Sequence, residues 1–128
     1  MSVPVELGGL AEVMGRYRFA YLLTSTVGAP HAVAVAPLFD EGEFVLHGVG
    51  RRSRENLLAR PEVSLVWPPE SEGGYSLIVD GQASARDDAV RIRPRRAVLH
   101  RPAPRPEPVA PGACGSDCVE LELPTPPV

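Results

Sequence analysis

Residues 44–67 read FVLHGVGRRSRENLLARPEVSLVW, and this stretch decides the fold. The apolar run over residues 43–48 is typical of a strand. The glycines and arginines that follow open a short predicted helix, with Ser53 as its N-cap or in its first turn and Pro61 as its stop. Residues 63–67 are again strand-like and end at a pair of prolines. The sequence therefore predicts a strand, a short helix and a second strand in direct succession.

Further strand-like segments lie on both sides of this unit. They cover residues 19–25, 31–39 and 75–85, so that five strands are expected up to residue 85. Glycine, proline and acidic residues form turns between them. Gly81, inside the last of these segments, marks a bulge or a close approach of two backbones. Residues 5–15 have roughly helical spacing of apolar residues. Five strands, one helix between the third and fourth strands, and short turns indicate an antiparallel barrel.

The pattern weakens beyond residue 86. Residues 87–88 form a turn, and residues 89–99 read as a strand that Pro94 interrupts. Residues 102–111 contain five prolines, which predicts an extended loop or arm. Residues 118–123 alternate apolar and acidic side chains and are expected to form a last strand. We therefore interpret residues 1–128 as one domain, with a core over 17–100 and a proline-rich arm and last strand over 101–128.

Composition excludes several classes of function. The net charge is −3 at 128 residues, which argues against a general nucleic-acid-binding protein. All thirteen basic residues are arginine, so chemistry that needs a lysine Schiff base is excluded. The chain has no stretch of about eighteen apolar residues, so no membrane span is expected. Its first residues do not resemble a signal peptide, and we expect a cytoplasmic protein.

The turn after the third strand has the chemistry of a phosphate site. A helix N-terminus presents unpaired N–H groups and a partial positive charge. Gly48 and Gly50 let the backbone approach a ligand, and Arg51, Arg52 and Arg54 add forked donors that suit phosphate. The motif is neither a P-loop nor a dinucleotide fingerprint. The alternative is a solvated basic loop ahead of an ordinary helix.

Residues 19–85 resemble the pyridoxamine 5'-phosphate oxidase-like, FMN-binding split-barrel family. The resemblance is carried by YLLTSTVGAPHAVAVAPLFD, by FVLHGVGRRSRENLLARPEVSLVWPP and by YSLIVDGQASA, in this order and at the family's spacing. It implies a mainly β fold, a six- to seven-stranded antiparallel split β-barrel with one N-terminal helix and one between strands three and four. It also implies a homodimer that holds FMN at the subunit interface, and a small-molecule substrate.

The resemblance assigns roles position by position. Arg52 matches the family's phosphate-binding arginine, and Gly50 matches the glycine of the preceding turn. His47 and Gly48 match positions that flank the flavin, and Ser76 falls where the oxidase has an amide near the ring. Where the family has a lysine this chain has Ser53, and Arg54 is one residue away to replace it. The predicted cofactor-binding set is His47, Gly48, Gly50, Arg51, Arg52, Ser53, Arg54, Asn56, Trp67 and Ser76.

The resemblance implies a hydride transfer between FMN and a small organic molecule, and no catalytic residue is assigned. Pyridoxamine phosphate is not the expected substrate, because Ala32 and Pro37 replace the basic residues that the true oxidases have there. Some family members use the deazaflavin F420 and others bind haem. The alternatives are therefore an F420-dependent reductase, or a non-catalytic flavin- or haem-binding protein.

A few other residues leave two interpretations open. Trp67 either covers an open end of the barrel or lies in a dimer interface, and the alternative is that it stacks on the flavin. The same alternatives hold for Tyr75. His100 is either an ordinary residue without a functional role or a ligand of haem or a metal ion. Cys114 and Cys118 lack the spacing of a redox pair or a complete zinc site, and two ordinary thiols are expected. Four arginines between residues 91 and 96 either bind an anionic cofactor tail or protect a strand edge.

Overall fold

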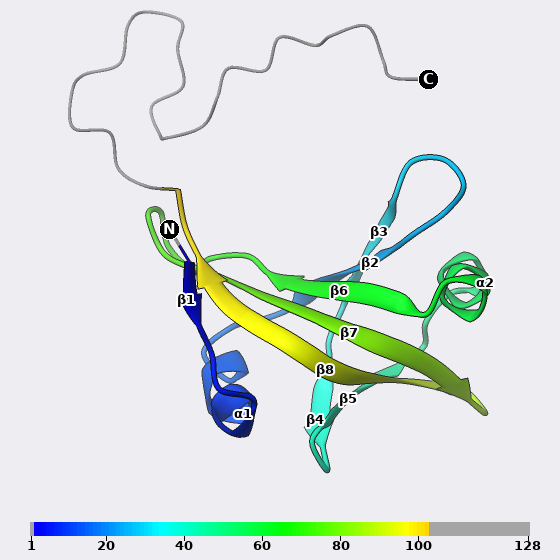
Figure 1. The fold of residues 1–128 in the computed structure, drawn as a ribbon, viewed down its shortest axis with the longest axis horizontal. Coiled ribbons are helices and arrows are strands. Elements are labelled where there is room, and N and C mark those ends of the chain that lie inside the picture. Colours follow the sequence, from blue (N-terminus) through cyan, green and yellow to red (C-terminus); the bar gives the residue numbers. More distant parts are fainter. Residues whose placement is uncertain (1, 103–128) are drawn as a thin grey trace, which may run out of the picture.

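The computed structural model describes residues 2–102. The C-terminal strand expected over 118–123, most of the proline-rich arm, and both cysteines lie outside the described residues. The elements are β1 (Ser2–Pro4), the 3₁₀ helix η1 (Leu7–Gly9), α1 (Leu10–Met14), β2 (Ala20–Thr24), β3 (His31–Val35), β4 (Leu38–Asp40), β5 (Glu43–His47), α2 (Arg51–Ala59), β6 (Glu62–Trp67), β7 (Ser76–Arg86) and β8 (Ala89–His100) (Figure 1). The mainly β class and the positions of both helices are confirmed.

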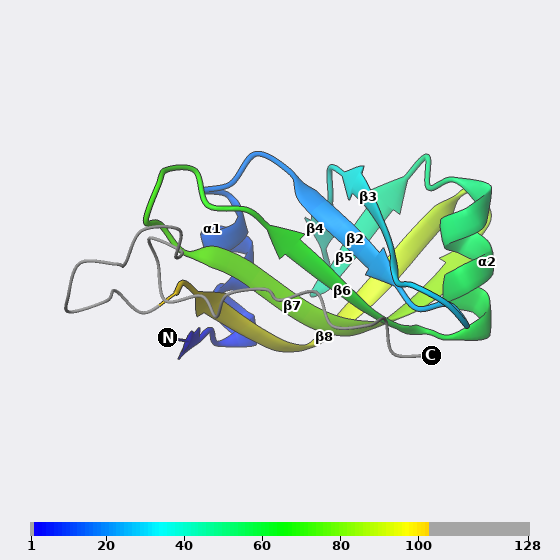
Figure 2. The same cartoon turned by 90° about the horizontal axis from the view of Figure 1, so that it is seen from above.

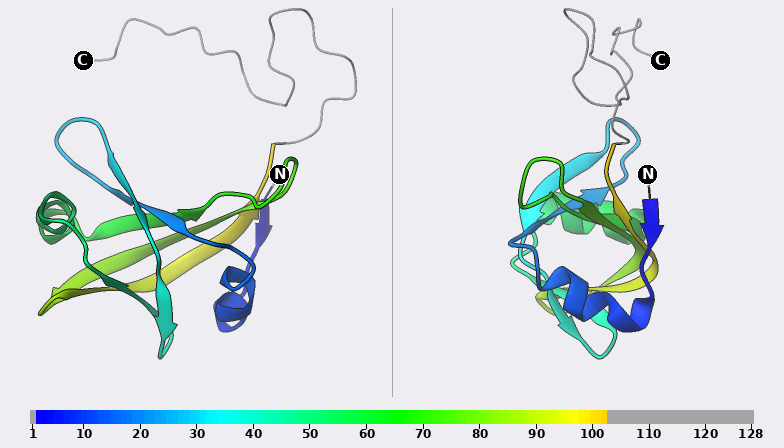
Figure 3. Two further views of the ribbon diagram at one scale, coloured as in Figure 1. Left: turned by 180° about the vertical axis from the view of Figure 1, so that it is seen from behind. Right: turned by 90° about the vertical axis from the view of Figure 1, so that its left-hand side faces the viewer.

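All strands belong to one antiparallel sheet with the order β3-β2-β6-β7-β8-β5-β4, and β1 adds to β8. The sheet curls around a central core, as the end-on view of Figure 3 shows. Its two outermost strands, β3 and β4, are neighbours in the sequence. The chain that runs from β3 into β4 therefore links the two ends of the sheet, which is consistent with a split barrel.

This link corrects the single strand expected over residues 31–39. β3 pairs with β2, whereas β4 pairs with β5 at the opposite end of the sheet. The break falls at Ala36 and Pro37, between the two strands. Pro37 has no N–H to donate to a ladder, so it fits the point where the chain leaves one partner for the other. Local pattern alone could not reveal this change of partner.

The core fills the inside of the curled sheet. Alternate residues of β2, β6, β7 and β8 point inward, as the burial pattern of β6 illustrates with Val63, Leu65 and Trp67. Leu10 of α1 is fully buried at one end of the barrel, and Leu57 of α2 is 1% exposed at the other. Figure 2 shows the two helices at opposite ends of the sheet. Each helix therefore covers one end of the core.

No helix within residues 2–102 is long and apolar enough to cross a membrane.

The longest hairpin, β7–β8, contains the irregularity that Gly81 predicted. The register shifts between Asp80 and Gly81, so that Gly81 lies opposite Pro94 and Asp80 opposite Arg96. A Cβ on Gly81 would lie 2.6 Å from the carbonyl oxygen of Arg93, so the two backbones approach as only glycine permits. Pro94 sits at this bulge, and β8 continues through it. The predicted interruption at Pro94 is thus a change of register within one strand.

Candidate functional site

The N-terminus of α2 is open. β5 ends at His47, and the chain turns at Gly48, whose φ of +70° is a conformation that glycine adopts freely. Gly50 is the N-cap residue and offers no side-chain cap, and the first helical hydrogen bond runs from Arg54 N to Gly50 O at 3.0 Å. The N–H groups of residues 51–53 therefore have no acceptor within the helix. The first turn also contains no acidic residue, so its positive potential is not neutralised.

Space lies above this turn. A Cβ built on Gly48 or on Gly50 would meet no atom within 4 Å. His47, at the end of β5, is exposed beside the turn. Open backbone donors, free space and a positive helix end are the features that a bound phosphate requires. The residues present therefore fit the phosphate group of a nucleotide-type cofactor.

The three arginines of this segment differ in their engagement. Arg54 donates from Nη2 to the carbonyl oxygen of Asp87 at 2.9 Å and so ties α2 to the β7–β8 turn. Arg51 forms an ion pair of 3.8 Å with Glu55, and both side chains are largely exposed. Arg52 is exposed and makes no side-chain hydrogen bond or ion pair within residues 2–102. Arg52 is therefore the arginine of this turn whose guanidinium is available to an anion without breaking a contact.

Two of the predicted ligands have structural contacts instead. Ser53 is 2% exposed, so its side chain is enclosed by the protein. Asn56 donates from Nδ2 to the hydroxyl of Thr24 at 3.0 Å and links α2 to β2. Nothing in the local sequence identifies Thr24 or Asp87 as partners, because both contacts join segments about thirty residues apart.

The flavin-stacking hypothesis for Trp67 is wrong for this structure. Its side chain is 1% exposed and lies in the core, with its ring centroid 5.3 Å from that of Phe44. A ring enclosed on all sides has no face to offer to a cofactor or to a partner subunit. Tyr75 is also engaged, because its carbonyl accepts a hydrogen bond from Tyr17 and the Arg101 guanidinium lies 4.6 Å from its ring centre.

Ser76 lies far from the α2 turn. It pairs with His100 at the start of β7, whereas the β7 end near α2 is at Arg86. Arg86 lies ten residue steps after Ser76 along the strand, a distance of about 33 Å at 3.3 Å per residue. One chain therefore does not bring Ser76 together with the other predicted ligands. His47, Gly48, Gly50, Arg51 and Arg52 do lie together.

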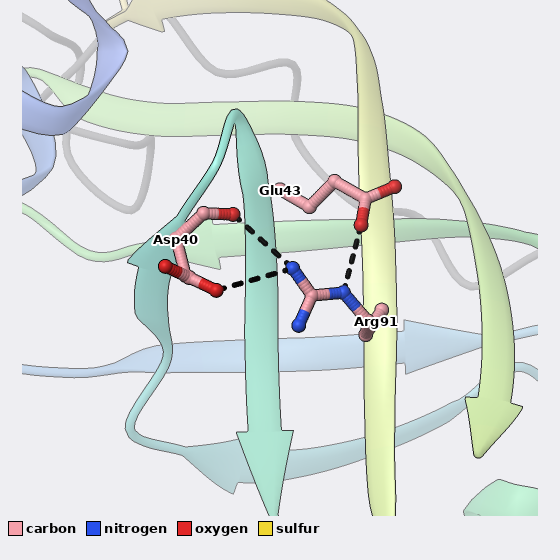
Figure 4. Close-up of polar contacts among 3 residues, drawn as sticks. All are labelled: Asp40, Glu43 and Arg91. Atoms are coloured by element: carbon pink, nitrogen blue, oxygen red, sulfur yellow. Dashed lines mark hydrogen bonds and ion pairs between the residues drawn. The ribbon is translucent and has the colours of Figure 1, made fainter.

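Arg91 lies on a part of β8 that is paired on both sides, whereas Arg93, Arg95 and Arg96 lie between the parts that pair with β5 and with β1, where β7 is the neighbouring strand in the ladder. β8 pairs with β7 along its length and also with β5 and β1. Figure 4 shows Arg91 between two carboxylates: its Nε donates to Glu43 at 2.7 Å and its Nη2 lies 3.5 Å from Asp40. The hydrogen bond to Glu43 is the main cause that raises the pKa of Arg91 above its ordinary value. Arg91 thus joins the β4–β5 hairpin to β8.

The histidines do not form a metal site within the part of the chain that the structure describes. No group of three or more His, Cys, Asp or Glu side chains there is placed to hold a metal ion. His31 lies on β3 and His47 on β5, while His100 Nδ1 lies 3.0 Å from the hydroxyl of Ser2. His100 is therefore engaged with β1.

The arrangement of this sheet is shared with solved structures. The chain aligns with a FAD-binding protein of Mesorhizobium loti at a TM-score of 0.62 and 16% identity, over 77% of this chain and 95% of the other. It aligns with a putative pyridoxamine 5'-phosphate oxidase of Listeria innocua at 0.61 and 15%, over 73% and 96%. An F420 reductase gives 0.57 and 17%, over 74% and 98%. The protein therefore has the pyridoxamine 5'-phosphate oxidase-like split-barrel fold.

Sequence comparison narrows the relationship further. No family model matches the chain. The chain is 42% identical to each of two relatives, the uncharacterized proteins Mb0449c of Mycobacterium bovis and MT0457 of Mycobacterium tuberculosis. Each alignment is 137 positions long and covers 94% of this chain and 96% of the relative. The chain belongs to one family with these two mycobacterial proteins.

Proposed function

We propose that the protein binds a flavin-type cofactor, FMN in the first place, with the phosphate at the N-terminus of α2. The single observation that carries the proposal is the free guanidinium of Arg52 beside three backbone N–H groups without helical acceptors. Arg52 supplies a forked pair of donors, and the N–H groups of residues 51–53 supply short-range donors to the same anion. The likeness of the fold to a FAD-binding protein supports a cofactor of this class.

The cofactor would supply the chemistry, since a bound flavin accepts or donates a hydride. The chain's own contribution is to bind and orient it. Gly48 and Gly50 leave the phosphate room, and Arg54 fixes the turn by its bond to Asp87. The function proposed is a flavin-dependent hydride transfer to or from a small organic molecule. F420 is the second candidate, which the likeness to an F420 reductase favours.

We further propose a homodimer that completes the site. A row of apolar residues crosses the outer face of the sheet as direct neighbours in the ladder: Ala34 of β3, Tyr21 of β2, Val66 of β6 and Ile78 of β7. Tyr21 is 41% exposed and Ala34 is exposed, although both lie on paired strands. Exposed apolar surface of this kind is typical of a protein interface. A second subunit would also offer a route by which the distant Ser76 reaches the cofactor.

Titration of FMN fluorescence with the purified full chain tests the proposal. Saturable binding is expected, and Arg52→Ala should weaken it by about 1.5–3 kcal/mol, the range for a charged hydrogen bond, or roughly ten- to a hundredfold in Kd. Arg60→Ala is the matched control, because it removes the same charge at the other end of α2. Equal loss in both variants would refute the assignment of Arg52. Binding of F420 but not FMN would select the second candidate.

Light scattering tests the homodimer separately. The wild-type chain is expected at twice the monomer mass, and Tyr21→Glu should shift it toward the monomer by placing a charge in the apolar row. A wild-type chain that is monomeric at micromolar concentration would overturn the dimer.

A further inference from the structure

The bulge in β7–β8 brings three arginines to one face of the sheet. In a regular strand Arg95 and Arg96 would point to opposite faces. The register shift at Asp80 and Gly81 adds one residue to β8 at this point, and Arg93, Arg95 and Arg96 are all exposed. Pro94 between them is buried, so the bulge is fixed by the core side of the strand as well as by Gly81. The three guanidinium groups are held on the outer face by the backbone itself.

Two of these arginines converge on one neutral atom. Arg93 Nη2 donates to the amide oxygen Oε1 of Gln82 at 3.0 Å, and Arg95 Nη2 donates to the same oxygen at 2.8 Å. Arg96, by contrast, has the carboxylate of Asp80 at 3.4 Å. Within residues 2–102 neither Arg93 nor Arg95 forms an ion pair. An amide oxygen cannot neutralise two guanidinium groups, and each of them keeps further N–H donors. The pair is therefore matched to an oxyanion that accepts from both.

A hollow adjoins the pair. It has a volume of about 260 Å³ and is lined by Glu43, Gln82, Ala83, Ser84 and Arg93. The carboxylate of Glu43 already accepts from Arg91 at 2.7 Å, which offsets its repulsion of an anion. Ser84 is exposed and offers a hydroxyl to the same space. The hollow is large enough for a small organic molecule, with Arg93 at its border.

We propose that Arg93 and Arg95, oriented by Gln82, form a binding site for the carboxylate or phosphate group of a small ligand whose body occupies this hollow. The site is distinct from the α2 turn: it lies on the outer face of β7 and β8, whereas Arg52 lies on the helix at the end of the barrel. Gln82 Oε1 accepts a hydrogen bond from each of the two arginines and so holds them side by side. Because this oxygen is neutral, both guanidinium groups keep their charge and further N–H donors for an anion. The proposal does not depend on the flavin site.

Residue-resolved NMR of the uniformly ¹⁵N-labelled full chain tests it. Inorganic phosphate and succinate are titrated separately, so that the two sources of an oxyanion are compared. Saturable shifts are expected at the amides of Gln82, Ser84, Arg93 and Arg95. Arg93→Ala/Arg95→Ala should weaken the affinity at least tenfold. The control Arg60→Ala/Arg86→Ala, which removes the same charge from exposed positions, should leave it within twofold. Arg52→Ala should also leave it unchanged, which separates this site from the proposed flavin site.

Gln82→Glu provides a second variant that keeps both arginines. The introduced carboxylate would form ion pairs with Arg93 and Arg95 and take the place of the added anion. Phosphate and succinate should then no longer shift the amide signals of these residues. Shifts that rise linearly without saturation, or that are equal in all variants, would overturn the proposal, as would Gln82→Glu with wild-type affinity. Saturation by succinate but not phosphate would assign the site to carboxylates, and the reverse to phosphates.

Discussion

Asn56 and Thr24 join the helix of the candidate site to the sheet: Asn56 Nδ2 donates to Thr24 Oγ1 at 3.0 Å. Thr24 is 2% exposed, so its hydroxyl has little access to water. Asn56 lies one turn of helix after Arg52, on α2. The bond therefore sets how α2, and with it the open N-terminal turn, sits against β2. We interpret Asn56 as a positioning residue for the proposed phosphate site.

Asn56→Ala should destabilise the protein by about 1–3 kcal/mol, because the buried hydroxyl of Thr24 loses its partner. Urea denaturation measures this. Leu58→Ala is the control on the same helix, since Leu58 is 66% exposed and should cost far less. Asn56→Ala should also weaken flavin binding, because the bond to Thr24 positions the N-terminal turn of α2. Asn56 would act in this way without contacting the cofactor. A variant as stable as Leu58→Ala would show that the bond contributes nothing.

Gly81→Ala should be destabilising by about 1–3 kcal/mol, the usual cost of overpacking. The new Cβ would lie 2.6 Å from Arg93 O and 2.8 Å from Ile92 Cγ2, and the first of these is a backbone atom that cannot move aside cheaply. Thermal unfolding followed by circular dichroism gives the comparison. Gly8→Ala serves as control, because a Cβ there meets no atom within 4 Å. Equal melting temperatures for the two variants would contradict the close approach of β7 and β8.

Much of the fold could be predicted from sequence because its signals are local. Pro61 ends α2, Gly81 marks the bulge and residues 87–88 form the turn, each through its own backbone chemistry. The change of partner at Pro37 and the inner position of β8 could not be predicted in this way. Both depend on which strands, distant in the sequence, lie side by side.

The candidate site shows the same division. The proximity of Gly48, Gly50 and Arg52 could be predicted because a turn and a helix N-terminus are consecutive in the chain. The burial of Trp67 could not be predicted, because alternation gives the face of a strand but does not say which face is enclosed. Arg51, Arg52 and Arg54 look equivalent in sequence, and they differ only through contacts such as that of Arg54 with Asp87.

The burial of Trp67 gives a direct spectroscopic prediction, since the chain has one tryptophan. Its emission should be blue-shifted relative to free indole, and acrylamide should quench it several-fold less efficiently than in the denatured chain. A quencher of this size does not enter a close-packed core. Quenching in the native protein that equals the value in concentrated guanidinium would place Trp67 at the surface and reopen the stacking hypothesis.

Tyr17 links stability to alkaline pH. Its hydroxyl donates to Tyr75 O at 2.9 Å, and burial raises its pKa above 10.0, partly opposed by Arg16 and assisted by Glu70. A phenol whose pKa is higher in the folded state keeps its proton longer than in the unfolded chain. Its contribution to stability is therefore complete below about pH 10, the unfolded value, and is lost as pH rises through the folded value.

Tyr17→Phe removes both the hydrogen bond and the titrating proton. At neutral pH the variant should be less stable by about 1 kcal/mol, the typical net value of one hydrogen bond. Above pH 10 the gap between the two proteins should narrow, because only the wild type loses the Tyr17 contribution there. Urea denaturation at a series of alkaline pH values measures the gap. A gap that stays constant up to the most alkaline pH at which the wild type folds would mean that the ionisation of Tyr17 is not coupled to unfolding.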